Sequence, residues 1–275
     1  MLTPGIDALL RRIAATPPPF YAGVTELARV PPTERQRVLQ DQLAHLPYGR
    51  RGFPDAADPI RVGTTGSGDD LLLLAWTAAD LACEIEAGAR VFGRLGIGPG
   101  MRVANALPGA LATPGALLLG DVIESIGALD VPLGVLDGPA AAKAAWELLD
   151  RVEASVLVLD PASADALFAG MPAGARPWWQ GIVWLRSDRL PPRDRPAPPP
   201  TFAGWQRGWL AVPDAACFVA HEITPGHFQL DEGVHAEVDA GRLLVTPLAS
   251  DVALLRYVSA IAVRAFDPTT ATIEL

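Results

Sequence analysis

A loop rich in glycine and hydroxyl side chains occupies residues 61–70, where it reads Arg-Val-Gly-Thr-Thr-Gly-Ser-Gly-Asp-Asp. Gly63 and Gly66 flank Thr64 and Thr65, so backbone N–H groups and hydroxyls can point inward together, as a bound phosphate requires. The same composition is typical of an ordinary hairpin turn that leads into a strand, and the apolar run 71–76 follows directly. The residues alone leave both interpretations open.

Three histidines and a cysteine form a second group of residues that could do chemistry: Cys217, His221, His227 and His235. Imidazole and thiolate are zinc ligands, but the spacing Cys-x3-His-x5-His-x7-His matches no common zinc pattern. We therefore expect exposed or hydrogen-bonded histidines here, and no zinc. A serine hydrolase is not indicated either, because no Gly-x-Ser-x-Gly elbow occurs in the sequence.

Composition limits the class of protein further. The chain has 275 residues, half of them apolar, which is enough for one large domain or two smaller ones. Its net charge is −9 and the basic residues are dispersed, so nucleic acid is not an expected partner. No leader is apparent and no apolar run approaches the ~20 residues that span a bilayer, so we expect a cytoplasmic protein without membrane contact.

The pattern of elements predicts an α/β fold. Strands and helices alternate across residues 61–222, which favours a mostly parallel sheet flanked by helices. Residues 1–60 read as a helical lead-in arm, and residues 223–275 as a small β-rich region with a hairpin turn at 239–241. Within the core, Thr77 is placed to cap a helix that ends before Gly96.

The order of several segments resembles the amino-terminal part of the phenylacetate–CoA ligase branch of the adenylate-forming enzymes. The segments that carry the resemblance are Leu-Pro-Tyr-Gly at 46–49, the loop at 61–67, Gly-Arg-Leu-Gly-Ile-Gly-Pro-Gly at 93–100, residues 217–226, and Arg-Tyr at 256–257. The resemblance implies an AMP-forming acid–thiol ligase fold that uses ATP and Mg²⁺ to activate a small carboxylate. Some members of that family hold a structural metal near the region that corresponds to residues 217–235, but the Cys and His spacing here does not favour zinc.

The resemblance assigns roles to particular positions. The implied nucleotide-binding residues are Gly63, Thr64, Thr65, Gly66, Ser67, Phe218, His221 and Arg256. The implied acyl-pocket residues are Ala110, Ala112, Thr113 and Gly115, and the implied magnesium ligand is Glu222. Phe218 would stack on adenine, although the apolar run around it favours a place in the core, and Glu222 could equally be a solvated carboxylate at a strand end.

Several positions depart from the family pattern. After Thr-Thr-Gly the family usually carries a basic residue, whereas this chain has Ser67 and then two acids, Asp69 and Asp70, which would repel a triphosphate. Residues 258–261 replace the run whose aspartate holds the ribose. We further expect the family's carboxy-terminal lid, with its lysine, to be absent. Lys143, the sole lysine, lies in an internal helix. Without a cation at the reacting carboxylate, adenylation should lose orders of magnitude.

Three functional interpretations are consistent with these matches to the family pattern and departures from it. The preferred one is a degenerate, lid-less homologue of AMP-forming aryl or acyl-CoA ligases that retains ligand or partner binding. One alternative is an active carboxylate-activating enzyme, completed by a separate lid or carrier protein. Another is a structural subunit of a ligase complex, for which a homodimer is also considered.

Overall fold

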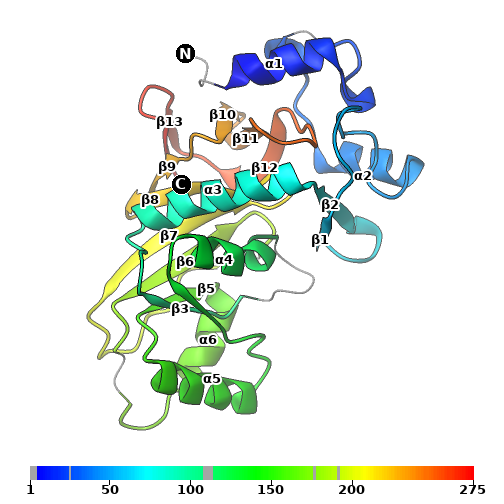
Figure 1. Ribbon diagram of the computed structural model, residues 1–275. Helices are drawn as coiled ribbons and strands as arrows, with labels where there is room; N and C mark the ends of the chain where they lie inside the picture. The colour runs from blue at the N-terminus through cyan, green and yellow to red at the C-terminus, as the bar shows by residue number, and fades with distance from the viewer. Residues whose placement is uncertain (1–4, 25, 108–113, 176–177, 191–192) are drawn as a thin grey trace.

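The computed structural model describes residues 5–24, 26–107, 114–175, 178–190 and 193–275, and for residues 114–117 only the backbone. In Figure 1 the amino-terminal helices and a small three-stranded sheet lie at one end of the molecule, and helices α5 and α6 lie at the other. A large sheet connects the two ends.

The large sheet has nine strands in the order β13-β14-β9-β8-β7-β6-β5-β3-β4. Its strands are β3 (Arg102–Asn105), β4 (Leu129–Pro132), β5 (Val156–Leu159), β6 (Gly181–Ser187), β7 (Trp205–Val212), β8 (Ala216–Thr224), β9 (His227–Leu230), β13 (Ala265–Asp267) and β14 (Thr272–Glu274). Neighbours from β4 to β7 run parallel, and neighbours from β7 to β13 run antiparallel. Strand pairing in the sheet therefore changes from parallel to antiparallel at β7.

Helices cover both faces of the parallel half, as the burial pattern of β5 demonstrates. Val156 and Val158 pack into the core beneath α3 (Ala78–Arg94) and α4 (Pro114–Ser125), whereas Leu157 and Leu159 pack with Trp146 of α5 (Pro139–Val152). Successive strand residues point to opposite faces, so a strand that is apolar throughout must be covered on both sides. Helix α6 (Pro161–Ala169) joins α5 on the second face. None of the helices in the described ranges is long and apolar enough to cross a bilayer.

Two smaller sheets flank this core. The hairpin of β1 (Arg61–Thr65) and β2 (Leu72–Trp76) is one, and β10 (Val234–Asp239), β11 (Arg242–Pro247) and β12 (Tyr257–Ala262) form the other. The amino-terminal segment contributes α1 (Ile6–Ala15), two short 3-10 turns (Pro19–Tyr21 and Leu27–Arg29) and α2 (Arg35–Ala44). Isolated bridges between Thr33 and Tyr257 and between Gly52 and Val252 fix this segment to the carboxy-terminal one.

The start of α3 is fixed by a capping box. The Thr77 side chain accepts from the Asp80 backbone N–H at 3.1 Å, and the Asp80 carboxylate accepts from the Thr77 N–H at 2.9 Å. The second carboxylate oxygen of Asp80 accepts from the backbone N–H of Asp251 at 2.6 Å and from the Ser250 hydroxyl at 3.0 Å. One cap thus orients the long helix and the loop before β12 together.

The predicted α/β fold class is confirmed, including helices on both faces of the parallel strands and a β-rich carboxy-terminal region. The sequence pattern did not predict β7, β9, β13 or β14. Strand β7 follows a proline-rich segment that reads as a linker, and the other three strands are only three or four residues long. Strands this short carry little period-two signal.

Helix α3 offers a matched test of its packing on α4. A Cβ on Gly88 would lie 2.4 Å from Val122 Cγ2, whereas a Cβ on Gly93 meets nothing within 4 Å. We expect Gly88→Ala to lower the free energy of unfolding by about 1–3 kcal/mol through overpacking. Gly93→Ala should raise it by up to about 1 kcal/mol through helix propensity. Urea denaturation of both variants measures the difference, and equal effects would contradict close α3–α4 packing at Gly88.

Candidate functional site

The loop singled out as a phosphate cradle connects β1 and β2 and includes a 3-10 turn at Gly68–Asp70. Thr65 is fully buried, while Ser67 is exposed. Gly66 has φ +75, and a Cβ there would lie 2.1 Å from the carbonyl oxygen of Asp70. Glycine is therefore required at this position to close the turn.

Arg35, from the first turn of α2, fills the inside of this loop. Its Nη1 donates to Thr65 Oγ1 at 3.1 Å and its Nη2 to the Thr65 carbonyl at 3.1 Å. Nε donates to the carboxylate of Asp70 at 3.0 Å, and Nη2 also donates to the Asp70 carbonyl at 2.5 Å. A side chain of this protein thus binds groups that the sequence analysis reserved for a phosphate.

Asp214 lies beneath the loop, in the turn between β7 and β8, and its side chain has no solvent exposure. Thr65 donates its hydroxyl to Asp214 Oδ1 at 2.5 Å, and both Arg35 Nη1 and the Tyr257 hydroxyl donate to Oδ2. Burial, with the Asp214 charge beside it, raises the pKa of Tyr257 far above the ordinary tyrosine value. We call the set Arg35, Thr65, Asp70, Asp214 and Tyr257 the Asp214 network.

Phe218 and His221, predicted to bind nucleotide, lie on β8. Phe218 is buried and stacks on Trp209 with a centroid distance of 5.0 Å and an interplanar angle of 10°. His221 is 6% exposed, and its Nδ1 has no hydrogen-bond partner among the described residues. Burial, together with the charge of Arg94, lowers the pKa of His221, so the imidazole is neutral at pH 7.

Glu222, the predicted magnesium ligand, is bound by protein groups on both oxygens. Arg195 Nη2 donates to Oε2 at 2.7 Å, and the Gly226 backbone N–H donates to Oε1 at 2.9 Å. Over the described ranges, no three His, Cys, Asp or Glu side chains cluster closely enough to hold a metal ion. Glu222 pairs with Arg195, whereas Asp214 pairs with Arg35 and, at 3.9 Å, with Arg189.

The remaining predicted positions are dispersed. Arg256 has φ +49, and its side chain donates to Glu237 at 2.9 Å and to the Val30 carbonyl at 2.6 Å. Gly115 lies in the first turn of α4. Ala110, Ala112 and Thr113 fall outside the described residues.

A cleft of about 780 Å³ lies over the sheet near Glu222 and the segment 260–262. Arg186, Arg193 and Arg195 line it. Burial, reinforced by the neighbouring Arg195, lowers the pKa of Arg186. The buried carboxylate of Asp188 also lines the cleft, and its Oδ1 has no partner among the residues that the structure describes. The cleft thus offers guanidinium groups to an anion, whereas the Asp188 side chain has no solvent exposure.

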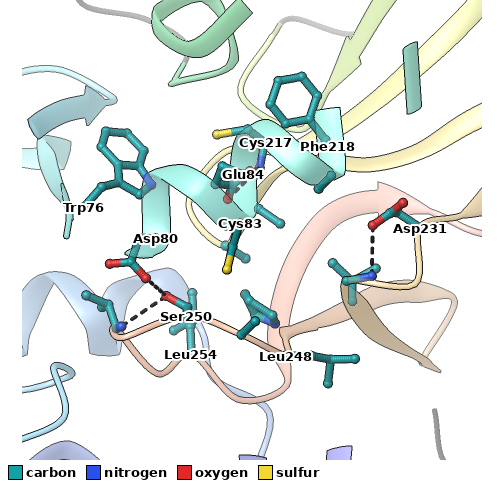
Figure 2. Close-up of a pocket in the computed structure, with 18 of the residues that line it drawn as sticks. Trp76, Asp80, Cys83, Glu84, Cys217, Phe218, Asp231, Leu248, Ser250 and Leu254 are labelled. Carbon is teal, nitrogen blue, oxygen red and sulfur yellow. Dashed lines mark hydrogen bonds between the residues drawn. The ribbon is translucent and has the colours of Figure 1, made fainter. Parts of the chain in front are cut away.

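A second cavity, of about 450 Å³, is shown in Figure 2. It lies between α3, the turn that follows β7, the turn before β10 and the loop 247–254, and it shares no lining residue with the cleft. Glu84 of α3 lies in its wall, where its carboxylate accepts the Cys217 backbone N–H at 3.2 Å. Burial, with the charges of Asp80 and Asp231 nearby, raises the pKa of Glu84 to about 7.

The sequence analysis missed Arg35, Asp188, Asp214 and Glu84. Asp188 and Asp214 directly follow apolar runs that form β6 and the end of β7, so a carboxylate after a buried strand was an available signal. Arg35 and Glu84 are single charged residues on amphipathic helices. Nothing in their local pattern distinguishes them from solvated residues.

No protein-family model and no curated protein matches this sequence. Solved structures match in fold. 2-Hydroxyisobutyryl-CoA ligase in an open conformation, in complex with 2-HIB-AMP and CoA, matches with TM-score 0.77 and 15% identity over 98% of this chain and 71% of the ligase chain. The same ligase in its thioesterification state gives TM-score 0.73 and 17% identity over 98% and 66%. An AMP-forming acyl-CoA synthetase-like protein from Dyadobacter fermentans gives 0.50 and 13% over 88% and 68%.

These matches confirm the resemblance to adenylate-forming enzymes at the level of the fold. The chain spans 62–71% of the length of the 2-hydroxyisobutyryl-CoA ligase chains that it matches. At identities of 14–17%, the likeness concerns the path of the backbone and not the residues of the site.

Removal of Arg35 tests the Asp214 network. Arg35→Ala leaves the buried Asp214 without its short ion pair, so we expect the free energy of unfolding to fall by about 3 kcal/mol. Arg37→Ala on the same helix is the matched control, because Arg37 is exposed and contacts only the Phe20 ring among the interactions described, at 4.5 Å. That variant should lose about 1 kcal/mol or less. Urea denaturation of both proteins gives the comparison, and similar losses would refute the role of Arg35.

The pH dependence of stability tests the environment of Glu84. Its folded-state pKa of about 7 lies above the ordinary glutamate value of 4.5, so stability is highest below pH 4.5 and falls as pH rises from 4.5 through 7. Glu84→Gln keeps an acceptor for Cys217 but cannot ionise. We expect the variant to gain on the order of 2 kcal/mol over wild type between pH 5 and 8. Unfolding measured at both pH values checks this, and parallel pH profiles would contradict it.

Proposed function

Because the chain has the fold of the AMP-forming ligases, we propose that it is a ligand-binding relative of these enzymes that does not complete adenylation on its own. The observation that carries this proposal is the occupied phosphate loop. Arg35 and Asp214 already use the Thr65 hydroxyl, and Arg35 uses the Thr65 carbonyl. The loop is therefore held closed by contacts within the protein.

Opening the loop for a triphosphate would be unfavourable for two reasons. The guanidinium of Arg35 would have to leave a fully buried carboxylate, and breaking such a pair costs several kcal/mol. The carboxylates of Asp70 and Asp214 would then lie close to the phosphates, and like charges at about 4 Å repel by roughly 4 kcal/mol near a protein surface. A phosphate-binding loop that is open before the ligand arrives would have neither of these energetic costs.

The surroundings of Glu222 support the same proposal. A magnesium ion at this carboxylate would have to displace Arg195, which lies 2.7 Å away and carries a permanent positive charge. Magnesium prefers several oxygen ligands in octahedral geometry, and the described residues hold no group of three possible ligands there. Glu222 is better placed to position Arg195 in the cleft than to bind a metal.

The cleft is where a ligand would bind under this proposal. The 2-hydroxyisobutyryl-CoA ligase structures named above are complexes with 2-HIB-AMP and CoA, both phosphate-bearing molecules. Arg186 could contact such phosphates, as could Arg193, which lies 2.8 Å from Asp165. The retained function would therefore be recognition of a phosphorylated or acyl-phosphate ligand.

The same cleft supports a second candidate, an active ATP-dependent carboxylate-activating enzyme that is completed by a separate polypeptide. The cleft volume of about 780 Å³ is ample for a nucleotide, and its arginines supply positive charge that the loop lacks. In this case the partner protein would bring the missing lysine. A cytoplasmic location and a homodimer remain parts of the proposal without a structural argument of their own.

Calorimetric titration with ATP and Mg²⁺, AMP and CoA, alongside an assay for AMP release with CoA and a panel of aryl and acyl carboxylates, tests the proposal. We expect no AMP release, together with binding of at least one of these phosphate ligands that Arg186→Ala weakens at least tenfold. Thr201→Ala, at an exposed site away from the cleft, is the control. AMP release that disappears in Thr65→Ala would favour the active enzyme. No heat with any of the three ligands would contradict retained binding.

A further inference from the structure

The cavity in Figure 2 differs in chemistry from the arginine-lined cleft. Its walls combine apolar side chains, including Trp76, Phe218, Leu248 and Leu254, with carboxylates. Six acidic residues line it, against two arginines: Asp80, Glu84, Glu86, Asp214, Asp231 and Glu232, with Arg51 and Arg90. The volume of about 450 Å³ suits a small organic molecule.

Most of these charges are already paired within the protein. Asp80 accepts from the α3 cap and from the loop before β12. Asp231 accepts from Arg90 Nε at 3.0 Å and Nη2 at 2.6 Å, and Glu232 lies 3.3 Å from the same guanidinium. Asp214 belongs to the network described above. Four of the lining carboxylates are therefore fixed in place by partners within the protein.

Glu84 and Glu86 form no ion pair with any described residue, but Glu86 is exposed to solvent whereas Glu84 is only partly exposed, in the cavity wall. A carboxylate has acceptor sites for about four hydrogen bonds, and the Cys217 N–H is the donor to Glu84 among the described residues, so Glu84 has acceptor sites left for a ligand. Figure 2 shows Glu84 beside Cys217 and above Cys83, with the Phe218 ring pointing away from Leu248 and Leu254.

We propose that this cavity binds a small apolar molecule that carries one protonated amine, with the ammonium at Glu84 and the apolar part against Ala87 and Leu248. An ammonium supplies the donors and the positive charge that Glu84 lacks. A carboxylate or phosphate ligand would instead meet acidic groups on three sides. Arg51 also lines the cavity, near Asp41 and Asp214, and it is the one feature that would favour an anion.

The proton on Glu84 makes the binding pH-dependent. The groups that face Glu84 are Asp80 on its own helix, Asp231 before β10 and Cys217 on β8, and both acids favour its protonated form. An alkyl ammonium remains charged throughout the neutral range, so only Glu84 changes its charge between pH 5.5 and 8.5. Amine affinity should therefore increase as pH rises through about 7.

Calorimetric titration of the full chain with 2-phenylethylamine tests the proposal, with 2-phenylethanol and 3-phenylpropanoate as probes of similar shape. At pH 8 we expect the amine to bind at least tenfold more tightly than the alcohol, and the acid to bind more weakly still. Glu84→Gln should weaken amine binding at least tenfold and remove its pH dependence. Glu86→Gln, which changes another lining acid on the same helix, should leave both unchanged.

A second variant guards against a folding defect in Glu84→Gln. Ala87→Leu fills the cavity from α3 without altering any charge, and it should abolish binding of the amine and the alcohol alike. Equal affinities for amine and alcohol, or tightest binding of 3-phenylpropanoate, would overturn the proposal. So would the same loss of amine affinity in Glu84→Gln and Glu86→Gln. These measurements use no nucleotide, so their failure is distinguishable from failure of the proposed ligand binding in the cleft.

Discussion

A carboxylate without any solvent exposure, that of Asp214, is the constraint on which the arrangement of this protein depends. A buried carboxylate must be matched by donors, and here the donors come from α2, β1 and β12. The β1–β2 hairpin and helix α2 are thereby held over the point where the sheet changes from parallel to antiparallel. The same interactions that hold these elements in place also fill the loop where a phosphate would bind.

Stability and catalysis therefore make opposite demands on one set of groups. An enzyme that binds phosphate at a hydroxyl-rich loop needs the hydroxyls and N–H groups to be available. In this protein Arg35 provides the cation that the loop lacks, and it does so from within the fold. Two cavities, with no lining residue in common, remain outside this closed loop. They carry opposite charge, which separates the kinds of ligand that each one can accept.

The sequence predicted the parallel half of the fold well because its signals are local. Apolar strands of four to seven residues alternate with amphipathic helices between residues 101 and 187, and a capping residue such as Thr77 marks where a helix begins. The antiparallel half was harder, because β9, β13 and β14 are short and lie at one edge of the sheet. A strand of three residues is specified by its neighbours more than by its own pattern.

The candidate site could be predicted only in part, and the reason is sequence distance. The loop at 63–67 was recognisable from its composition, but its partners Arg35 and Asp214 lie 30 and 149 residues from Thr65. No local pattern connects residues so far apart. Glu84 could not be distinguished from the exposed acids of the same helix, since its unusual environment arises from Cys217, which belongs to β8.

The distances along the chain within the Asp214 network also bear on how the protein folds. Arg35 and Asp214 are separated by 179 residues, and Tyr257 lies 43 residues beyond Asp214. A contact between residues so far apart in the sequence closes a large loop of chain. The conformational entropy of that loop must be lost before the contact can stabilise the fold. The network should therefore form after the folding transition state, once the parallel sheet is in place. Interactions that form late mainly slow unfolding, so the closed loop would prolong the lifetime of the native state without speeding its formation.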